Sequence, residues 1–164
     1  MVSHPPPQGP DFFGCDLNSD AIEWVSAHLP HVRVCANGLN PPLPFEGAFF
    51  DLCYSVSVFT HLPDALQRPW IEELHRVVRR GGVLMLTLSG EGDFVRLTPA
   101  EQNEFEQGRL VVVDAKHPGS NLCGVYHPEE YVRQEWSDLF RLLRRYPQGA
   151  AGSPYQDLYV FERI

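Results

Sequence analysis

The sequence has no long apolar segment, and nothing in it approaches the roughly 18–20 apolar residues that a membrane-spanning helix needs. Residues 1–10 are rich in proline and lack the apolar core of a signal peptide. These absences argue against a membrane span and against secretion. We therefore expect a soluble, cytoplasmic protein.

The cysteine patterns of a zinc site or a disulfide framework are also missing. None of the 4 cysteines forms a C-x-x-C pair, and most of them lie in apolar runs. The sequence shows no cluster of His, Cys and acidic residues at metal-ligand spacing. We expect reduced thiols and no bound metal.

Positive charge is scarce. The chain has 13 Lys and Arg against 21 Asp and Glu, a formal net charge of −8. Because an acidic surface repels phosphate backbones, no nucleic-acid partner is expected. Basic residues gather only in the short segments 76–80 and 141–145, which we interpret as helix C-termini and solvated helix faces.

What the chain does contain is an alternation of short apolar strands and amphipathic helices. Its 164 residues are the size of one domain. Residues 1–10 are expected to be a disordered proline-rich tail, and residues 11–164 a single domain. The first four strands are expected near residues 12–17, 32–36, 49–55 and 83–88. This pattern predicts an α/β, Rossmann-like fold with a mostly parallel sheet, helices on both faces and Asp16, Asn37 and Ser55 along one edge.

The helices are delimited by prolines and glycines. Asp64 is expected to cap a helix, but Pro69 is tolerable only in a first turn, so the regular part is expected to begin later. Gly81 and Gly82 are expected to end this helix as a left-handed cap. Further on we expect a hairpin between residues 109–114 and 122–126, a helix over 128–140 and an antiparallel closing strand over 157–163.

Two polar residues follow the first two strands. Asp16 ends the first apolar run, where ligands bind in open α/β sheets, and its carboxylate could accept hydrogen bonds from both ribose hydroxyls of a nucleotide. An aspartate before a helix can equally be a helix cap. Asn37 could read an adenine edge, although an Asn-Gly pair more often forms a turn.

Three runs carry a family resemblance: F-G-C-D-L-N at 13–18, L-P-F-E-G-A-F-F-D-L at 43–52 and E-L-H-R-V-V-R-R-G-G-V-L at 73–84. The chain resembles the class I S-adenosylmethionine-dependent methyltransferases, and among them the methyltransferase-domain group that acts on small molecules. Segments near 97–99, 121–123, 126–128 and 156–159 are similar to a bacterial subgroup associated with glycan or lipid assembly.

The resemblance implies S-adenosylmethionine as cofactor and a set of residues that bind it. Asp16 would bind the ribose hydroxyls, with Leu17 beside the adenine. The segment Asn37-Gly38-Leu39 would surround the adenine ring. Tyr54 and Ser55 would line the methionine side near the methyl group.

One departure from the family pattern concerns the front of the chain. The family begins with a strand and a G-x-G-x-G loop that approaches the methionine part of the cofactor. Residues 1–10 contain only Gly9 and cannot form that loop. We therefore expect an N-terminally truncated domain, with weak or no methyltransferase activity by itself.

His61 is the candidate catalytic base, because it follows the third strand at the expected ligand edge; a packed or capping histidine is the alternative. His127 has the same two interpretations. The sequence thus predicts methyl transfer from S-adenosylmethionine to a small-molecule or sugar-type acceptor. The alternatives are a non-catalytic remnant that serves as a binding module, and a nicotinamide-dependent oxidoreductase that uses Asp16 for the ribose.

Overall fold

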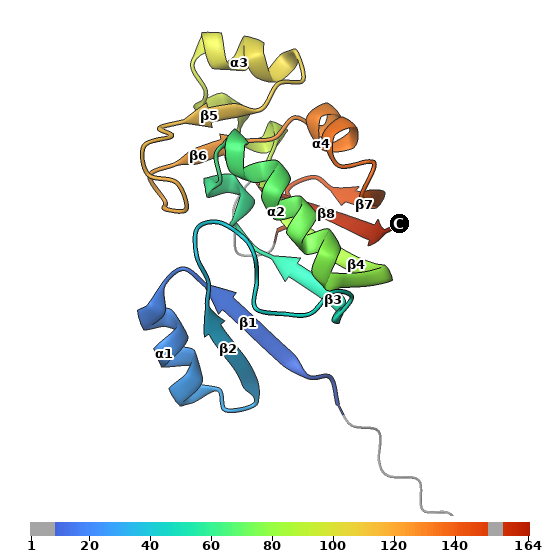
Figure 1. Cartoon of the computed structure of the whole chain (residues 1–164). Helices are drawn as coiled ribbons and strands as arrows, with labels where there is room; N and C mark the ends of the chain where they lie inside the picture. Colours follow the sequence, from blue (N-terminus) through green and yellow to red (C-terminus); the bar gives the residue numbers. More distant parts are fainter. Residues whose placement is uncertain (1–8, 151–155) are drawn as a thin grey trace, which may run out of the picture. The chain divides into compact units, whose positions relative to one another are not determined.

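The computed structural model describes residues 9–150 and 156–164 of the chain (Figure 1). The expected tail over residues 1–10 falls mostly on residues outside this described part. The chain divides after Leu39 into two compact units, which we call the N-terminal unit and the C-terminal unit.

The N-terminal unit is a strand–helix–strand segment. Its elements are β1 (Phe12–Asp16), α1 (Ser19–His28) and β2 (Val32–Ala36). The strands pair in parallel from Phe12 opposite Val32 to Asp16 opposite Ala36, so both end at the same edge. Asn18 caps α1, since its side-chain oxygen accepts hydrogen bonds from two N–H groups of the first turn.

The C-terminal unit is built on a six-stranded mixed sheet. Its strands follow the order β5-β6-β4-β8-β7, and β3 pairs with β4 beside this path. β3 and β6 run parallel to β4, whereas β8 runs antiparallel to it and to β7. The elements of this unit are β3 (Phe50–Ser55), η1 (Phe59–His61), α2 (Asp64–Val77), β4 (Val78–Ser89), η2 (Glu91–Arg96), α3 (Pro99–Glu106), β5 (Val111–Val113), β6 (Gly124–Tyr126), α4 (Glu129–Glu135), β7 (Phe140–Tyr146) and β8 (Gln156–Arg163).

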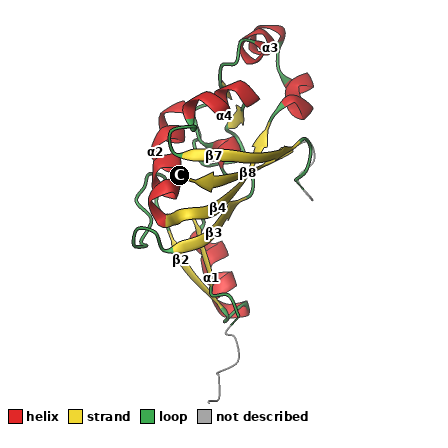
Figure 2. Cartoon of the chain, turned by 90° about the vertical axis from the view of Figure 1, so that its right-hand side faces the viewer, coloured by secondary structure: helices red, strands yellow, loops and turns green. Residues whose placement is uncertain are grey.

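The core of this unit lies between the sheet and α2. Alternate residues of β4, Leu84 and Leu86, are fully buried and stand opposite Phe161 and Tyr159 of β8. Ile71 and Val77 of α2 are equally buried. Figure 2 shows α2 and α4 on the same side of the β4, β8 and β7 strands. No helix in the described part of the chain is long and apolar enough to cross a membrane.

The α/β, Rossmann-like fold and the antiparallel last strand are confirmed. The four expected strands form as two parallel pairs, β1 with β2 and β3 with β4, but the pairs belong to different sheets. Among the described residues no strand pairs with the second edge of β1 or of β3, so nothing joins the two pairs into one sheet.

Two local predictions around α2 are wrong. The helix begins at Asp64 and continues through Pro69, which lies inside it. Trp70 and Ile71, directly after the proline, are buried, and we attribute the persistence of the helix to their packing. Gly81 and Gly82 lie within β4 and do not cap α2, which ends at Val77. A Cβ on Gly82 would lie 2.8 Å from the Arg79 carbonyl oxygen, so close packing explains the glycine there.

The region after α4 also differs from the expectation. The helix predicted over 128–140 ends at Glu135, and the basic segment 141–145 is part of strand β7. Arg141 and Arg145 of this strand pair with acidic residues. The predicted hairpin is confirmed as β5 with β6.

His127, which follows β6, is fully buried and serves packing. Its Nε2 lies 3.2 Å from Gln67 Oε1. The Gln67 amide nitrogen donates to the carbonyls of Phe59 and Leu62, so its oxygen is the acceptor and His127 Nε2 carries the proton. Burial lowers the pKa of His127 to about 3, which keeps the ring neutral.

Replacing His127 by glutamine should therefore change how stability depends on pH. An unfolded histidine has a pKa of about 6.5, so below that pH the unfolded chain binds a proton that folded His127 excludes. Wild type then loses stability as pH falls toward 3, by up to about 1.4 kcal/mol per pH unit from this group. The stability advantage of wild type over His127→Gln should shrink by about 2 kcal/mol between pH 6.5 and 5. Urea unfolding of wild type and His127→Gln at the two pH values measures this change in stability, with His31→Gln as an exposed control. A stability difference that stays the same at both pH values would contradict the assignment of His127 as a buried, neutral ring.

Candidate functional site

The carboxyl ends of β1 and β2 bring Asp16 and Asn37 together within the N-terminal unit. Asp16 stands opposite Ala36, the last residue of β2, and the N–H of Asn37 donates to the Asp16 carbonyl oxygen at 3.1 Å. The two predicted nucleoside-binding residues are therefore adjacent at the edge where ligands bind in parallel sheets.

Asp16 is not the cap of α1, because Asn18 fills that position. Its side chain is exposed, and its Oδ1 accepts a hydrogen bond from the Asn18 N–H at 2.8 Å. This bond fixes the direction of the carboxylate, and each carboxylate oxygen can accept more than one bond. The structure thus removes the capping alternative and leaves an exposed, oriented acceptor.

The turn interpretation of Asn37 is borne out by its own hydrogen bond. Its amide nitrogen donates to the carbonyl of Gly38 at 2.8 Å, which stabilises the turn after β2. A side-chain amide has a second hydrogen and an oxygen, so Asn37 can still donate one hydrogen bond and accept others. Leu17 is 41% exposed and Leu39 is half-buried, so both offer apolar surface near this edge.

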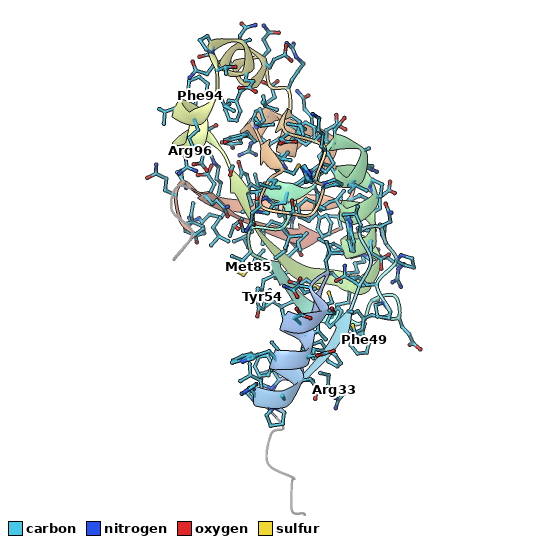
Figure 3. The ribbon with its side chains drawn as sticks, turned by 90° about the vertical axis from the view of Figure 1, so that its left-hand side faces the viewer. Arg33, Phe49, Tyr54, Met85, Phe94 and Arg96 are labelled. Atoms are coloured by element: carbon cyan, nitrogen blue, oxygen red, sulfur yellow. The ribbon has the colours of Figure 1, made fainter. Side chains whose placement is uncertain are left out.

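Tyr54 and Ser55 occupy the carboxyl end of β3 in the C-terminal unit. Tyr54 stands opposite Met85 of β4 and is 71% exposed (Figure 3). Ser55, opposite Leu86, is half-buried. Both are thus at a strand end, as predicted, but on the other compact unit from Asp16.

A polar network holds the segment that follows β3. Ser57 has a φ of 57° and donates its backbone N–H to Thr87 Oγ1 at 2.8 Å. Thr87 Oγ1 donates to Gln156 Oε1 at 2.7 Å, and Gln156 Nε2 donates back to Ser57 Oγ at 2.8 Å. Such a left-handed serine persists only where its surroundings hold it, and it is common at functional sites.

A cavity of about 300 Å³ lies next to this network. It is situated where β4 and β6 end and β8 begins, so it too lies at the edge formed by the carboxyl ends of the parallel strands. Its lining residues are Thr60, His61, Ser89, Asp93, Arg96, Asn121, Cys123, Gly124, Val125, Tyr126 and Gln156.

His61 lines this cavity with a defined tautomer. Its Nδ1 lies 2.7 Å from the Cys123 carbonyl oxygen. A carbonyl can only accept, so Nδ1 carries the proton, and Nε2 of the neutral ring bears a lone pair. Gly119 N–H also donates to the His61 carbonyl at 2.7 Å, which anchors the backbone. These two contacts fix the orientation of the ring and the backbone of His61.

Several cavity residues escaped the sequence analysis. Asp93 is almost completely buried although its side chain is polar, and Tyr126 lies on the short strand β6. Burial raises the pKa of the Tyr126 phenol, and the nearby Asp93 charge raises it further, so the hydroxyl stays a hydrogen-bond donor. The sequence signal available for Asp93 was a single acid after Gly90-Glu91-Gly92, which is too common to identify a site.

Comparison with known proteins identifies the family of the chain. Residues 3–86, about half of the chain, match the family described as "Methyltransferase domain". A tRNA (carboxymethyluridine(34)-5-O)-methyltransferase of Arabidopsis thaliana is 37% identical over 78 residues, which are 47% of this chain and 19% of that protein. The chain thus spans about a fifth of the length of this curated relative.

Solved structures share the fold. An S-adenosylmethionine-dependent methyltransferase of Methanosarcina mazei superposes with a TM-score of 0.69 at 17% identity, covering 93% of this chain and 81% of that one. The N-methyltransferase NodS of Bradyrhizobium japonicum, solved with S-adenosyl-L-homocysteine, gives a TM-score of 0.59 at 16% identity, covering 92% and 65%. The chain belongs to the methyltransferase-domain family of class I S-adenosylmethionine-dependent methyltransferases, and S-adenosylmethionine is its cofactor.

Proposed function

We propose that the chain directs methyl transfer from S-adenosylmethionine to a hydroxyl group of a small polar acceptor, which binds in the cavity lined by His61. The observation that supports this proposal is the placement of a polar cavity and an oriented imidazole together at the carboxyl ends of the strands. The alternative of a non-catalytic remnant is not favoured, because residues 3–86 match the methyltransferase-domain family.

The residues of the N-terminal unit fit the nucleoside part of the cofactor. A carboxylate fixed by one N–H retains the capacity to accept from two ribose hydroxyls, and the Asn37 amide beside it can both donate and accept. Asp16 and Leu17 with Asn37, Gly38 and Leu39 would hold the nucleoside. When bound, S-adenosylmethionine supplies an activated methyl group.

The role of His61 is to remove a proton from the acceptor. An acceptor hydroxyl becomes a better nucleophile as its proton passes to Nε2, while Nδ1–H stays bound to the Cys123 carbonyl. A positioned base of this kind contributes about 10²–10⁴-fold to the rate.

A nucleic-acid acceptor is the second candidate, since the Arabidopsis relative is by its name a tRNA methyltransferase. The charges of this chain oppose that candidate. Most of its arginines pair with carboxylates within 4 Å, for example Arg76 with Glu73 and Arg79 with Asp51. Guanidinium groups paired in this way are poorly available for a phosphate backbone. We therefore propose a small molecule.

Replacing Asp16 by alanine should weaken S-adenosylmethionine binding by about 1–3 kcal/mol, roughly 5- to 150-fold, because the ribose hydroxyls lose a charged acceptor. Asp20→Ala is the matched control, since Asp20 is an exposed acid in the first turn of α1. Isothermal titration calorimetry of the three proteins measures the effect. Equal affinity of the Asp16 variant and wild type would remove Asp16 from the site.

The proposed activity itself is tested with methyl-labelled S-adenosylmethionine and two acceptor pools, one of small hydroxylated molecules and one of unmodified tRNA. Label should appear in a small product whose new methyl group is attached to oxygen. Label in the tRNA fraction alone would overturn the choice of acceptor.

A further inference from the structure

Asp93, one of the residues that line the cavity, has a buried carboxylate oxygen with an incomplete set of partners. The side chain of Asp93 is 5% exposed, and its Oδ1 accepts no hydrogen bond from any residue in the described part of the chain. Arg96 Nε lies 3.3 Å from this oxygen, so the two charges attract although no hydrogen bond forms between them. A buried acceptor without a donor is unfavourable, and a bound molecule that supplies a donor would relieve it.

The rest of the lining is mostly neutral and polar. Ser89, Asn121 and Tyr126 offer two hydroxyls and an amide, which can act as donors and as acceptors. Hydroxyl groups of a ligand also act in both ways, so they match such a wall. Phosphate or carboxylate groups, which only accept when ionised, would leave the acceptors of the wall unpaired.

The charged residues of the lining also favour an uncharged ligand. Its one carboxylate and its one guanidinium, Asp93 and Arg96, lie against each other, and Arg96 extends toward solvent with 59% of its side chain exposed (Figure 3). An anionic ligand would meet the Asp93 carboxylate in the buried part of the cavity. A volume of about 300 Å³ is at the lower end for small-molecule sites.

We infer that the cavity selects an uncharged, hydroxyl-rich acceptor of the size of a single sugar ring, and that Asp93 Oδ1 accepts a hydrogen bond from one of its hydroxyls. This inference rests on the proposed function, because it names the class of the acceptor. Asp93 is a specificity-determining residue in this account, and His61 faces the hydroxyl that is methylated.

The test uses two sugars that differ in one charge, methyl glucoside and the methyl glycoside of glucuronic acid, with saturation-transfer NMR on the whole chain and no cofactor present. Wild type should bind the neutral sugar at least about tenfold more tightly than the acid. Asp93→Asn, which keeps the shape and removes the charge, should weaken the neutral sugar about tenfold and narrow the preference to less than about threefold. Glu106→Gln, an exposed substitution outside the lining, should behave as wild type.

Any of three results would overturn the inference. In the first, wild type binds the acid as tightly as the neutral sugar or more tightly. In the second, Asp93→Asn keeps the preference of wild type for the neutral sugar, and in the third, neither sugar binds. If Asp93→Asn does not fold, Tyr126→Phe removes one donor from the same wall and should also weaken the neutral sugar. The assay reads binding alone. If the chain binds the neutral sugar through Asp93 but transfers no methyl group, the proposed function is refuted and this inference stands. If the chain methylates only acids, this inference is refuted and methyl transfer to a small molecule stands.

Discussion

Replacing Arg145 by methionine is expected to destabilise the C-terminal unit by about 3–5 kcal/mol, because it leaves a buried carboxylate without its counter-charge. Arg145 of β7 donates to Asp157 of β8 through Nε at 3.0 Å and a terminal nitrogen at 2.7 Å, and Asp157 is 1% exposed. Arg145 also forms ion pairs with Glu91 and Glu129, and its guanidinium lies 5.8 Å from the centre of the Tyr159 ring. A single guanidinium thus pairs with carboxylates from η2, α4 and β8.

The neighbouring Arg144 provides the matched control. It is exposed, and its guanidinium lies 5.6 Å from the centre of the Tyr146 ring. Arg144→Met should change the free energy of unfolding by less than about 0.5–1 kcal/mol. Urea unfolding of both variants at neutral pH gives the comparison, and a similar loss in the two would show that the ion-pair cluster is not what stabilises this region.

Replacing His61 by asparagine is expected to lower the rate constant kcat for methyl transfer about 10²–10⁴-fold, with a smaller effect on KM. Asparagine can still donate a hydrogen bond to the Cys123 carbonyl, as His61 Nδ1 does over 2.7 Å, but it offers no basic nitrogen.

His117→Asn, a change at an exposed histidine, controls for the loss of an imidazole in general. A kcat of His61→Asn within about threefold of wild type would show that His61 only packs against the cavity wall. A thermal midpoint near that of wild type is required, so that a loss of rate is not a loss of folded protein.

The sequence predicts the parallel strands well, because their signal is local. The runs at 12–17 and 49–55 are mostly apolar, and they form β1 and β3 within a residue or two of the expected limits. The position of Asp16 at a strand end follows from the same pattern. Strand β7 could not be found in this way, since its arginines are balanced by acids from α4 and β8 that are distant in sequence.

The cavity could not be predicted from the sequence either, because its residues are also distant from one another in the sequence. Its wall combines residues 60–61, 89–96, 121–126 and 156, and what makes Asp93 notable is its burial, which no local pattern reveals. His61 is identified from the sequence and also lies in the cavity. The sequence places His61 after the third strand, and in the structure its ring, with a fixed tautomer, is part of the cavity wall.

The central claim, that S-adenosylmethionine is the cofactor and is held through the strand ends, is tested most directly by calorimetric titration of S-adenosylmethionine and of NAD into the purified 164-residue chain. The account predicts saturable binding of S-adenosylmethionine and no binding of NAD. The Kd of S-adenosylmethionine should be high, roughly 0.1–1 mM, because the 164 residues carry no G-x-G-x-G loop to contact the methionine part. Binding of NAD, or no binding of S-adenosylmethionine at millimolar concentration, would contradict it.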